Sequence, residues 1–181
     1  LVQLDLANCT YEESQTWDRD SAEYAAKLRD AAQEYEETHS RYRSMLGGLY
    51  ARTWQGKCFE EQDDIDRAVG IYKELLGHPG KSTPMQQLQS QVLQFYLICL
   101  NHEKKKDYQL VIDKASDWLT KSPARQRYSP IALGIKWEQA LAYESLGTER
   151  TATPKEREDH LRFALKLVRD VKRFPGRYKD L

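Results

Sequence analysis

The chain has 181 residues, of which 40% are hydrophobic and 31% are charged. This composition is typical of a soluble globular protein and excludes a disordered chain, which would carry fewer apolar residues and more net charge. With only 9 Gly and 6 Pro, the chain also lacks the turn residues that an all-β fold of many short strands requires.

The formal net charge is +0, but acidic and basic side chains are unevenly distributed. Residues 1–64 hold 14 acidic and 7 basic side chains, whereas residues 65–181 hold 14 acidic and 21 basic ones. The two parts therefore have opposite balances of −7 and +7. Such an asymmetry indicates either an interaction surface or an attraction between the two ends, or with a neighbouring module.

Cys9, Cys58 and Cys99 lie far apart, are odd in number and form no CxxC pair, so we expect buried free thiols. No apolar run approaches the roughly 20 residues that span a bilayer, so we expect no membrane insertion. The start of the chain is too short and lacks the basic residues of a signal peptide. Because it begins at Leu rather than Met, we expect a piece of a longer protein, and the sequence indicates neither a compartment nor an oligomeric state.

Apolar residues recur at three- and four-residue spacing along most of the chain, which predicts helices rather than strands. One such stripe consists of Ile65, Ala68, Val69, Tyr72, Leu75 and Leu76. The expected helices lie near residues 10–37, 40–61, 64–76, 84–104, 107–121, 130–146 and 155–173. The segment 1–10 is not assigned.

Three of these helices start with a hydroxyl residue followed by proline: Thr83-Pro84, Ser129-Pro130 and Thr153-Pro154. A hydroxyl at the N-cap accepts a hydrogen bond from an otherwise unpaired backbone N–H, and proline at the first helical position loses nothing. Gln86 and Glu156, three residues after their caps, complete two of these signals as capping boxes.

An internal repeat is also visible. Gly56 and Phe59 are followed by Ala68, Tyr72 and Pro79, so that small and aromatic residues alternate across two helices. This arrangement resembles the tetratricopeptide motif. In that motif the small residues let two antiparallel helices approach closely, and the aromatic rings fill the space beside them.

Two further copies start from Cys99 and Ala140, which lie 43 and 41 positions after the preceding anchor. The usual tetratricopeptide period is about 34 residues, so these repeats are longer than usual. The resemblance implies an all-α fold, a right-handed superhelical stack of about three antiparallel helical hairpins over residues 40–79, 84–123 and 130–175. An extra N-terminal helix near 10–37 precedes them, and residues 1–181 form a single domain.

The residues that usually carry chemistry do not form a site, so we expect neither an enzyme nor a cofactor. The histidines follow no metal-ligand spacing; they are His39, His78, His102 and His160. Gly80-Lys81-Ser82 resembles the end of a phosphate-binding loop but has Leu75 where that loop needs glycine. Carboxylate pairs such as Glu60-Glu61 are interpreted as solvated faces of helices.

The resemblance also implies a concave groove lined by the first helix of each hairpin. Matching positions to the anchors gives these candidate binding residues: Tyr50, Thr53, Lys57, Glu60, Tyr96, Glu103, Trp137 and Glu144. Aromatic rings beside a row of carboxylates suit an extended segment that carries Lys or Arg, whereas solvated glutamates and packing between repeats are the alternative interpretation.

We therefore expect a non-catalytic scaffold that binds a peptide or a partner domain in its groove. A regulatory or assembly module of a larger multidomain protein is the alternative. A third hypothesis, less favoured because no nucleic-acid motif supports it, is nucleic-acid binding through the basic C-terminal half. The residues that suggest it are Arg125, Arg127, Arg169, Lys172, Arg173, Arg177 and Lys179.

Overall fold

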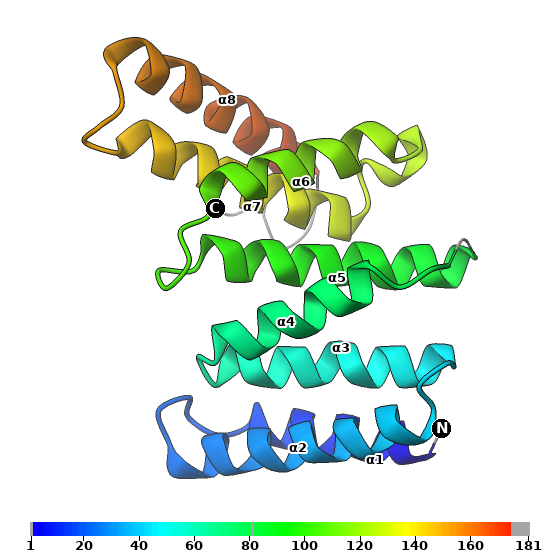
Figure 1. Cartoon of the computed structure of the whole chain (residues 1–181). Helices are drawn as coiled ribbons and strands as arrows, with labels where there is room; N and C mark the ends of the chain where they lie inside the picture. Colours follow the sequence, from blue (N-terminus) through cyan, green and yellow to red (C-terminus); the bar gives the residue numbers. More distant parts are fainter. Residues whose placement is uncertain (1, 81, 175–181) are drawn as a thin grey trace. The chain divides into compact units, whose positions relative to one another are not determined.

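The computed structural model describes residues 2–80 and 82–174, apart from the side chain at position 125. Within these ranges the chain is helical and contains no strand, which confirms the predicted all-α class there (Figure 1). The helices are α1 (Val2–Ser14), α2 (Ala22–Arg41), α3 (Leu46–Glu61), α4 (Ile65–Leu76), α5 (Thr83–Asn101), α6 (Tyr108–Lys121), α7 (Pro130–Thr148) and α8 (Pro154–Lys172), with a short 3-10 turn at Ala124–Gln126. The chain forms two compact units, Leu1–Tyr96 and Leu97–Leu181.

The predicted single helix over residues 10–37 is wrong. The chain leaves α1 after Ser14 and re-enters a helix at Ala22, because Ser21 provides an N-cap whose side chain accepts from the backbone N–H of Tyr24 at 3.1 Å. This polar capping interaction starts a new helix in a stretch where apolar periodicity alone suggested continuity. The first unit therefore begins with a helical hairpin rather than with one extra helix.

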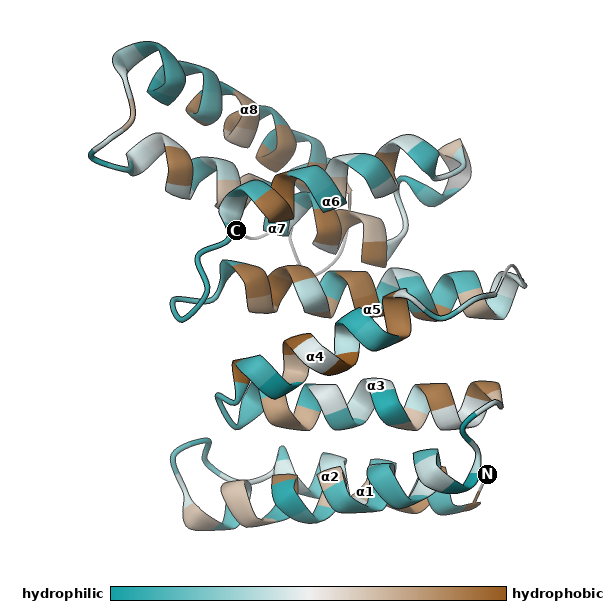
Figure 2. Ribbon diagram, in the orientation of Figure 1, coloured by the Kyte–Doolittle hydropathy of each residue, from teal (hydrophilic) through white to brown (hydrophobic). Residues whose placement is uncertain are grey.

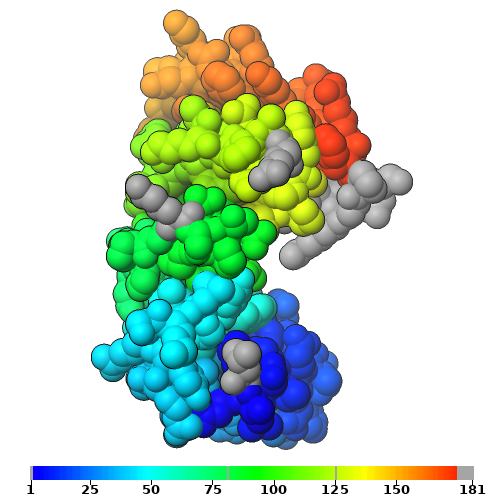
Figure 3. Space-filling model, turned by 90° about the vertical axis from the view of Figure 1, so that its right-hand side faces the viewer, coloured from blue at the N-terminus to red at the C-terminus, as the bar shows by residue number. Residues whose placement is uncertain are grey.

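Successive helices pack against each other in the first unit. The α2 helix lies against α1 and α3, and α3 lies against α4. The α1 and α3 helices also touch, and the dark blue and cyan atoms adjoin in the space-filling view (Figure 3). The core between them consists of Ala7, Tyr11, Tyr24, Leu28, Ala31, Ala32, Tyr35, Ala51 and Cys58. Alanines at these contacts let the helix backbones approach each other closely.

Gly56 lies at the crossing of α3 and α4. A Cβ atom at this position would stand 2.7 Å from Cε1 of Tyr72 and 3.2 Å from Cγ2 of Ile71. Both distances are shorter than an ordinary carbon–carbon contact. The missing side chain therefore makes room for the fully buried Tyr72 ring, as the spacing of the repeat predicted.

The second unit is built around α7, which packs against both α6 and α8. Its buried residues include Ala132, Ile135, Ala140 and Ala142. Hydrophobic bands alternate with hydrophilic residues along α8 (Figure 2), and its buried positions are Ala164 and Val171. The α8 helix thus buries one side against α7, and its solvent-exposed part carries both charged residues and the apolar side chains of Leu161, Phe163 and Leu165.

Two of the three helix starts predicted from a hydroxyl residue followed by proline are confirmed. Ser129 and Thr153 cap α7 and α8, and Thr153 forms the predicted capping box with Glu156. The third prediction is wrong, since Thr83 is already inside α5. Ser82, one residue earlier, accepts from the backbone N–H of Met85 at 3.4 Å and takes the capping position.

The capping box predicts a measurable stability effect. Replacing Thr153 with alanine removes an acceptor for the N–H of Glu156, so we expect the free energy of unfolding to fall by about 1 kcal/mol. Thermal or urea unfolding measures this loss. Thr151→Ala is the matched control, because Thr151 is exposed in the preceding turn; an equal loss in both variants would contradict the assignment.

All three cysteines are free thiols, as expected. Cys58 and Cys99 are buried, but the expectation of a buried thiol is wrong for Cys9, which is exposed. Among the described helices, none is long and apolar enough to cross a membrane.

Candidate interaction surfaces

Four of the predicted groove residues lie on α3. Thr53 is fully buried, and its hydroxyl donates to the carbonyl oxygen of Leu49 at 2.9 Å. Lys57 and Glu60 form an ion pair, with side-chain exposures of 18% and 10%. Tyr50 is half-buried. Three of these four side chains are therefore engaged within the first unit.

A buried carboxylate, Glu61, is the centre of a polar network that the sequence did not reveal. Its Oε1 accepts from the hydroxyl of Tyr11 at 2.8 Å, and its Oε2 accepts from the hydroxyl of Tyr24 and the amide of Gln15, both at 2.9 Å. The Lys57 ammonium stands 3.5 Å from Oε1. Since the donors come from α1, α2, α3 and the turn after α1, this carboxylate connects three helices.

Lys57 extends the network toward α4 and α5. Its ammonium pairs with Glu60 and also lies over the ring of Phe95, 5.3 Å from the centroid. Glu60 accepts from the hydroxyl of Tyr72 at 3.2 Å. The interpretation of Glu60-Glu61 as a solvated pair is therefore wrong, because both side chains are largely buried and receive donors from neighbouring helices.

The two adjacent carboxyl groups have opposite pKa shifts. Burial by itself raises the pKa of Glu61, but the nearby ammonium and three neutral hydrogen-bond donors outweigh it and hold this pKa below its usual value. Burial is also the largest influence on Glu60, and there it prevails and raises the pKa. Burial, followed by the charge of Glu61, raises the pKa of Tyr11 so that its hydroxyl remains a donor. Both carboxylates of this network have hydrogen-bond partners, and the network joins helices of the first unit to each other.

One signal for this network was present in the sequence. Lys57 precedes Glu60 and Glu61 by three and four residues, a spacing that pairs opposite charges on one helix. The contributions of Tyr11, Gln15 and Tyr24 depend on how α1 and α2 fold back onto α3. That approach is a tertiary property and has no local signature.

The remaining candidate residues have different environments. Tyr96, on α5, is buried. Glu103 and Glu144 are exposed, and Trp137 is partly buried. Trp137 and Glu144 both belong to α7 and are seven residues apart, which is close to two helical turns. They therefore lie on one side of that helix, as the repeat alignment predicted.

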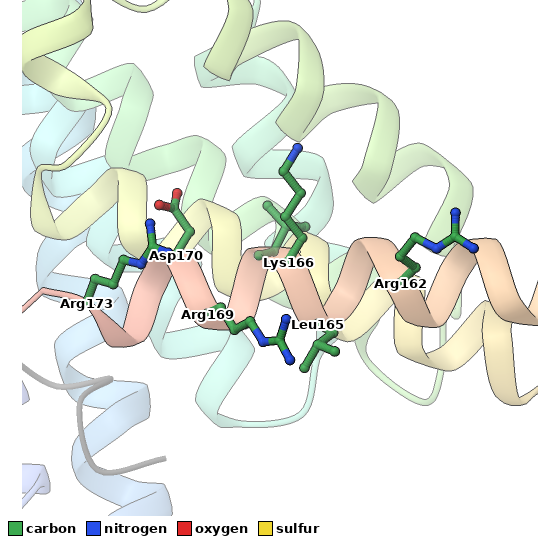
Figure 4. Close-up of a pocket in the computed structure, with 7 residues that line it drawn as sticks. Arg162, Leu165, Lys166, Arg169, Asp170 and Arg173 are labelled. Atoms are coloured by element: carbon green, nitrogen blue, oxygen red, sulfur yellow. The ribbon is translucent and has the colours of Figure 1, made fainter.

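A basic surface lies on the outer side of α8. Arg162, Lys166, Arg169 and Arg173 are all exposed and follow each other at intervals of four, three and four residues. They line a shallow hollow of about 460 Å³ together with Leu165, Leu167 and Asp170, and Figure 4 shows these side chains projecting from the helix. This spacing aligns four basic side chains along one face. Arg162 is paired with Glu158 at 2.6 Å, so Lys166, Arg169 and Arg173 carry most of the positive charge of this face.

A second hollow, of about 390 Å³, is lined by residues of α2, α3 and α4. Its wall contains an ion pair between Arg52 and Glu74 at 2.7 Å, and Arg52 also donates to Gln55 at 2.7 Å. His39 and His78 line it as well. Because the charges of Arg52 and Glu74 compensate each other, this hollow has no single preferred ligand charge.

The histidines make local contacts. Nδ1 of His39 lies 3.1 Å from the carbonyl oxygen of Gly48, and Nδ1 of His78 lies 3.0 Å from that of Pro79. A carbonyl oxygen only accepts, so both of these nitrogens donate. His160 packs against the ring of Tyr143 at 5.9 Å. Among the described residues, no group of three His, Cys, Asp or Glu side chains is arranged to hold a metal ion.

No known protein family, curated protein or solved structure matches this chain. The class that its described residues define is therefore a structural one: an all-α protein whose successive helices pack against each other.

Proposed function

We propose that the chain is a non-catalytic protein–protein interaction scaffold of the tetratricopeptide kind, whose hairpins stack as a right-handed superhelix. The serial packing of α1 to α4 in the first unit and of α6 to α8 in the second supports this proposal. So does the close approach of Gly56 to Tyr72, at a position that the repeat motif reserves for a small residue. Stacked hairpins of this type commonly present extended binding surfaces.

The position of the partly buried Trp137 and the exposed Glu144 on one side of α7 is the observation that carries the proposal. The uncovered part of an indole ring attracts the cation of a Lys or Arg side chain, and a carboxylate two turns along the helix forms a charged hydrogen bond with the next one. Glu103 adds another exposed carboxylate in the same unit. The proposed ligand is therefore an extended peptide segment with basic residues.

Thr53, Lys57, Glu60 and Tyr96 are left out of this proposed binding set. Thr53 and Tyr96 are buried, and Lys57 and Glu60 are bound to each other. A partner would have to break these internal contacts to reach them, which costs more than a surface contact returns.

Peptides selected on this chain from a random display library test the binding surface. We expect the selected peptides to be enriched in Lys or Arg and Trp137→Ala to weaken their binding at least about tenfold, because tryptophan is among the residues that dominate such interfaces. Glu144→Lys should weaken it further by charge repulsion. Isothermal titration calorimetry measures both losses.

The matched control for this experiment is Asp18→Lys. Asp18 is exposed in the turn between α1 and α2, so it undergoes the same charge reversal away from α7. The proposal is overturned if the selected peptides bind the Trp137 and Glu144 variants as tightly as they bind the Asp18 variant. Circular dichroism confirms that all three variants keep their helix content.

The basic side of α8 supports a second candidate function, nucleic-acid binding. Each neutralised phosphate releases counterions, so binding of a labelled single-stranded oligonucleotide would fall steeply as salt increases. Binding that is lost on charge reversal of Lys166 and Arg169 would establish this function. A regulatory or assembly module within a larger protein is the scaffold role in another setting, and the peptide experiment applies to it equally.

A further inference from the structure

The outer side of α8 combines positive charge with apolar surface. By helix periodicity, Arg162, Lys166 and Arg169 lie on the side opposite the buried residue Ala164. Beside them, Leu161 and Leu165 are 39% and 48% exposed, one helical turn apart. Exposed leucines next to a basic stripe are typical of a protein contact. Phe163, 50% exposed, adds further apolar surface to this helix.

The first unit has a surface of the opposite charge. Glu13, Asp30 and Glu34 on α1 and α2 all act on Lys27 and raise its pKa, the hydrogen bond from Lys27 to Glu13 most strongly. Lys27 thus lies among three negative charges, and Arg29 and Arg41 are two further exposed cations on α2. Glu37 continues this exposed acidic surface along α2.

Apolar residues also accompany this acidic surface. On α1, Val2 and Leu6 are 73% and 60% exposed and lie one turn apart. The acidic face, defined as α1 and α2 with Glu13, Asp30 and Glu37, therefore has the same composition as α8 with the sign of the charge reversed. The difference follows the unequal charge of the sequence, −7 over residues 1–64 and +7 over residues 65–181.

From this complementarity we infer that the basic face of α8 binds the acidic face of a second copy of the chain. Every copy carries both faces, so copies associate through unlike surfaces. Opposite charges bring the copies together and set their orientation, and the exposed leucine and valine side chains are then removed from water. This association is independent of peptide binding at Trp137.

The charge pairs between the two faces are exposed to solvent. Each pair therefore contributes little to the binding free energy by itself, and salt weakens it. We expect the sedimentation coefficient of the whole chain to rise with protein concentration at about 0.05 M salt, and to return to the monomer value at about 0.5 M salt, where screening shortens the reach of each charge. A monomer at every concentration and salt would overturn the inference. If the two faces of the same copy bind each other instead, the chain also remains a monomer at every concentration, and the inference is overturned in that case too.

Charge reversal of each face provides the decisive test. In a basic-face variant, Lys166→Glu and Arg169→Glu make α8 acidic; in an acidic-face variant, Asp30→Lys and Glu37→Lys make α2 basic. Each variant alone repels itself, so we expect both to sediment as monomers at low salt. An equimolar mixture should associate again, because the reversed faces attract each other.

The control is Lys114→Glu with Lys121→Glu, which changes the net charge equally on exposed positions of α6. This control should associate like the parent chain. Association of the basic-face variant alone, or no recovery in the mixture, would overturn the inference. So would a basic face that binds only an added oligonucleotide while the protein stays monomeric. Peptide binding by the monomeric variants would separate this result from the proposed scaffold function.

Discussion

Replacing Glu61 with alanine is expected to lower the free energy of unfolding by about 3–5 kcal/mol, the usual cost of removing one partner from a buried charged group. The carboxylate side chain is only 11% exposed, and its loss leaves the hydroxyls of Tyr11 and Tyr24 without their acceptor. Urea unfolding followed by circular dichroism measures the loss. Hydrogen exchange should show the largest effect in α1 and α2.

Two further variants test whether the network causes this loss. Glu61→Gln keeps the size and one acceptor oxygen, so its cost should be smaller than that of alanine. Glu12→Ala removes a carboxylate from an exposed position of α1 and should change stability by less than about 0.5 kcal/mol. If Glu61→Ala costs no more than Glu12→Ala, the network does not hold α1 and α2 in place.

The same carboxylate gives the first unit a defined pH response. The folded pKa of Glu61 is lowered from the ordinary value of 4.5, so its contribution to stability is present above that value and is lost as the pH falls through the folded pKa. The pH dependence of the Glu60 contribution has the opposite sign, because the folded pKa of Glu60 is raised. We expect Glu61→Gln to reduce the drop in thermal stability between neutral and strongly acidic pH, whereas Glu60→Gln should not.

Adding a single methyl group at Gly56 is expected to destabilise the first unit by about 1–3 kcal/mol, the cost of overpacking a core. Alanine is the better helix former, but its Cβ would lie 2.7 Å from the ring of Tyr72. The ring is fully buried and also packs against Phe95, so moving it disturbs the surrounding core. The loss should therefore appear in urea unfolding despite the gain in helix propensity.

Gly70 provides the matched control for this prediction. It lies within α4, is exposed, and a Cβ there would meet no atom within 4 Å. Gly70→Ala should therefore raise the free energy of unfolding by about 0.5–1 kcal/mol through helix propensity alone. If both substitutions stabilise the chain, the close crossing of α3 and α4 at Gly56 is wrong.

Local signals in the sequence predicted most of the helices. The capping serine and threonine at positions 129 and 153 determine where α7 and α8 begin, because the cap bonds to a backbone N–H only three residues away. The break after Ser14 was missed, although Ser21 has the same capping chemistry. Without a following proline, the sequence alone did not distinguish this serine from an ordinary polar residue on a helix.

The candidate sites were less predictable than the helices. Repeat spacing placed Trp137 and Glu144 on one side of α7, where Glu144 is exposed and Trp137 is partly buried. The same spacing placed Lys57 and Glu60 in the groove, where burial and ion pairing engage them instead. Spacing predicts which residues share a side of a helix, but it does not predict what another helix places against that side.

By itself, the sequence determined the all-α class, the positions of the capped helices, the need for a small residue at position 56 and the unequal distribution of charge. These properties depend on contacts within a few residues or on composition. Only the tertiary structure decided that Glu61 is a buried junction and that α8 exposes its basic side. Both outcomes depend on which helices fold back onto which, and that choice arises from the packing of residues far apart in the chain.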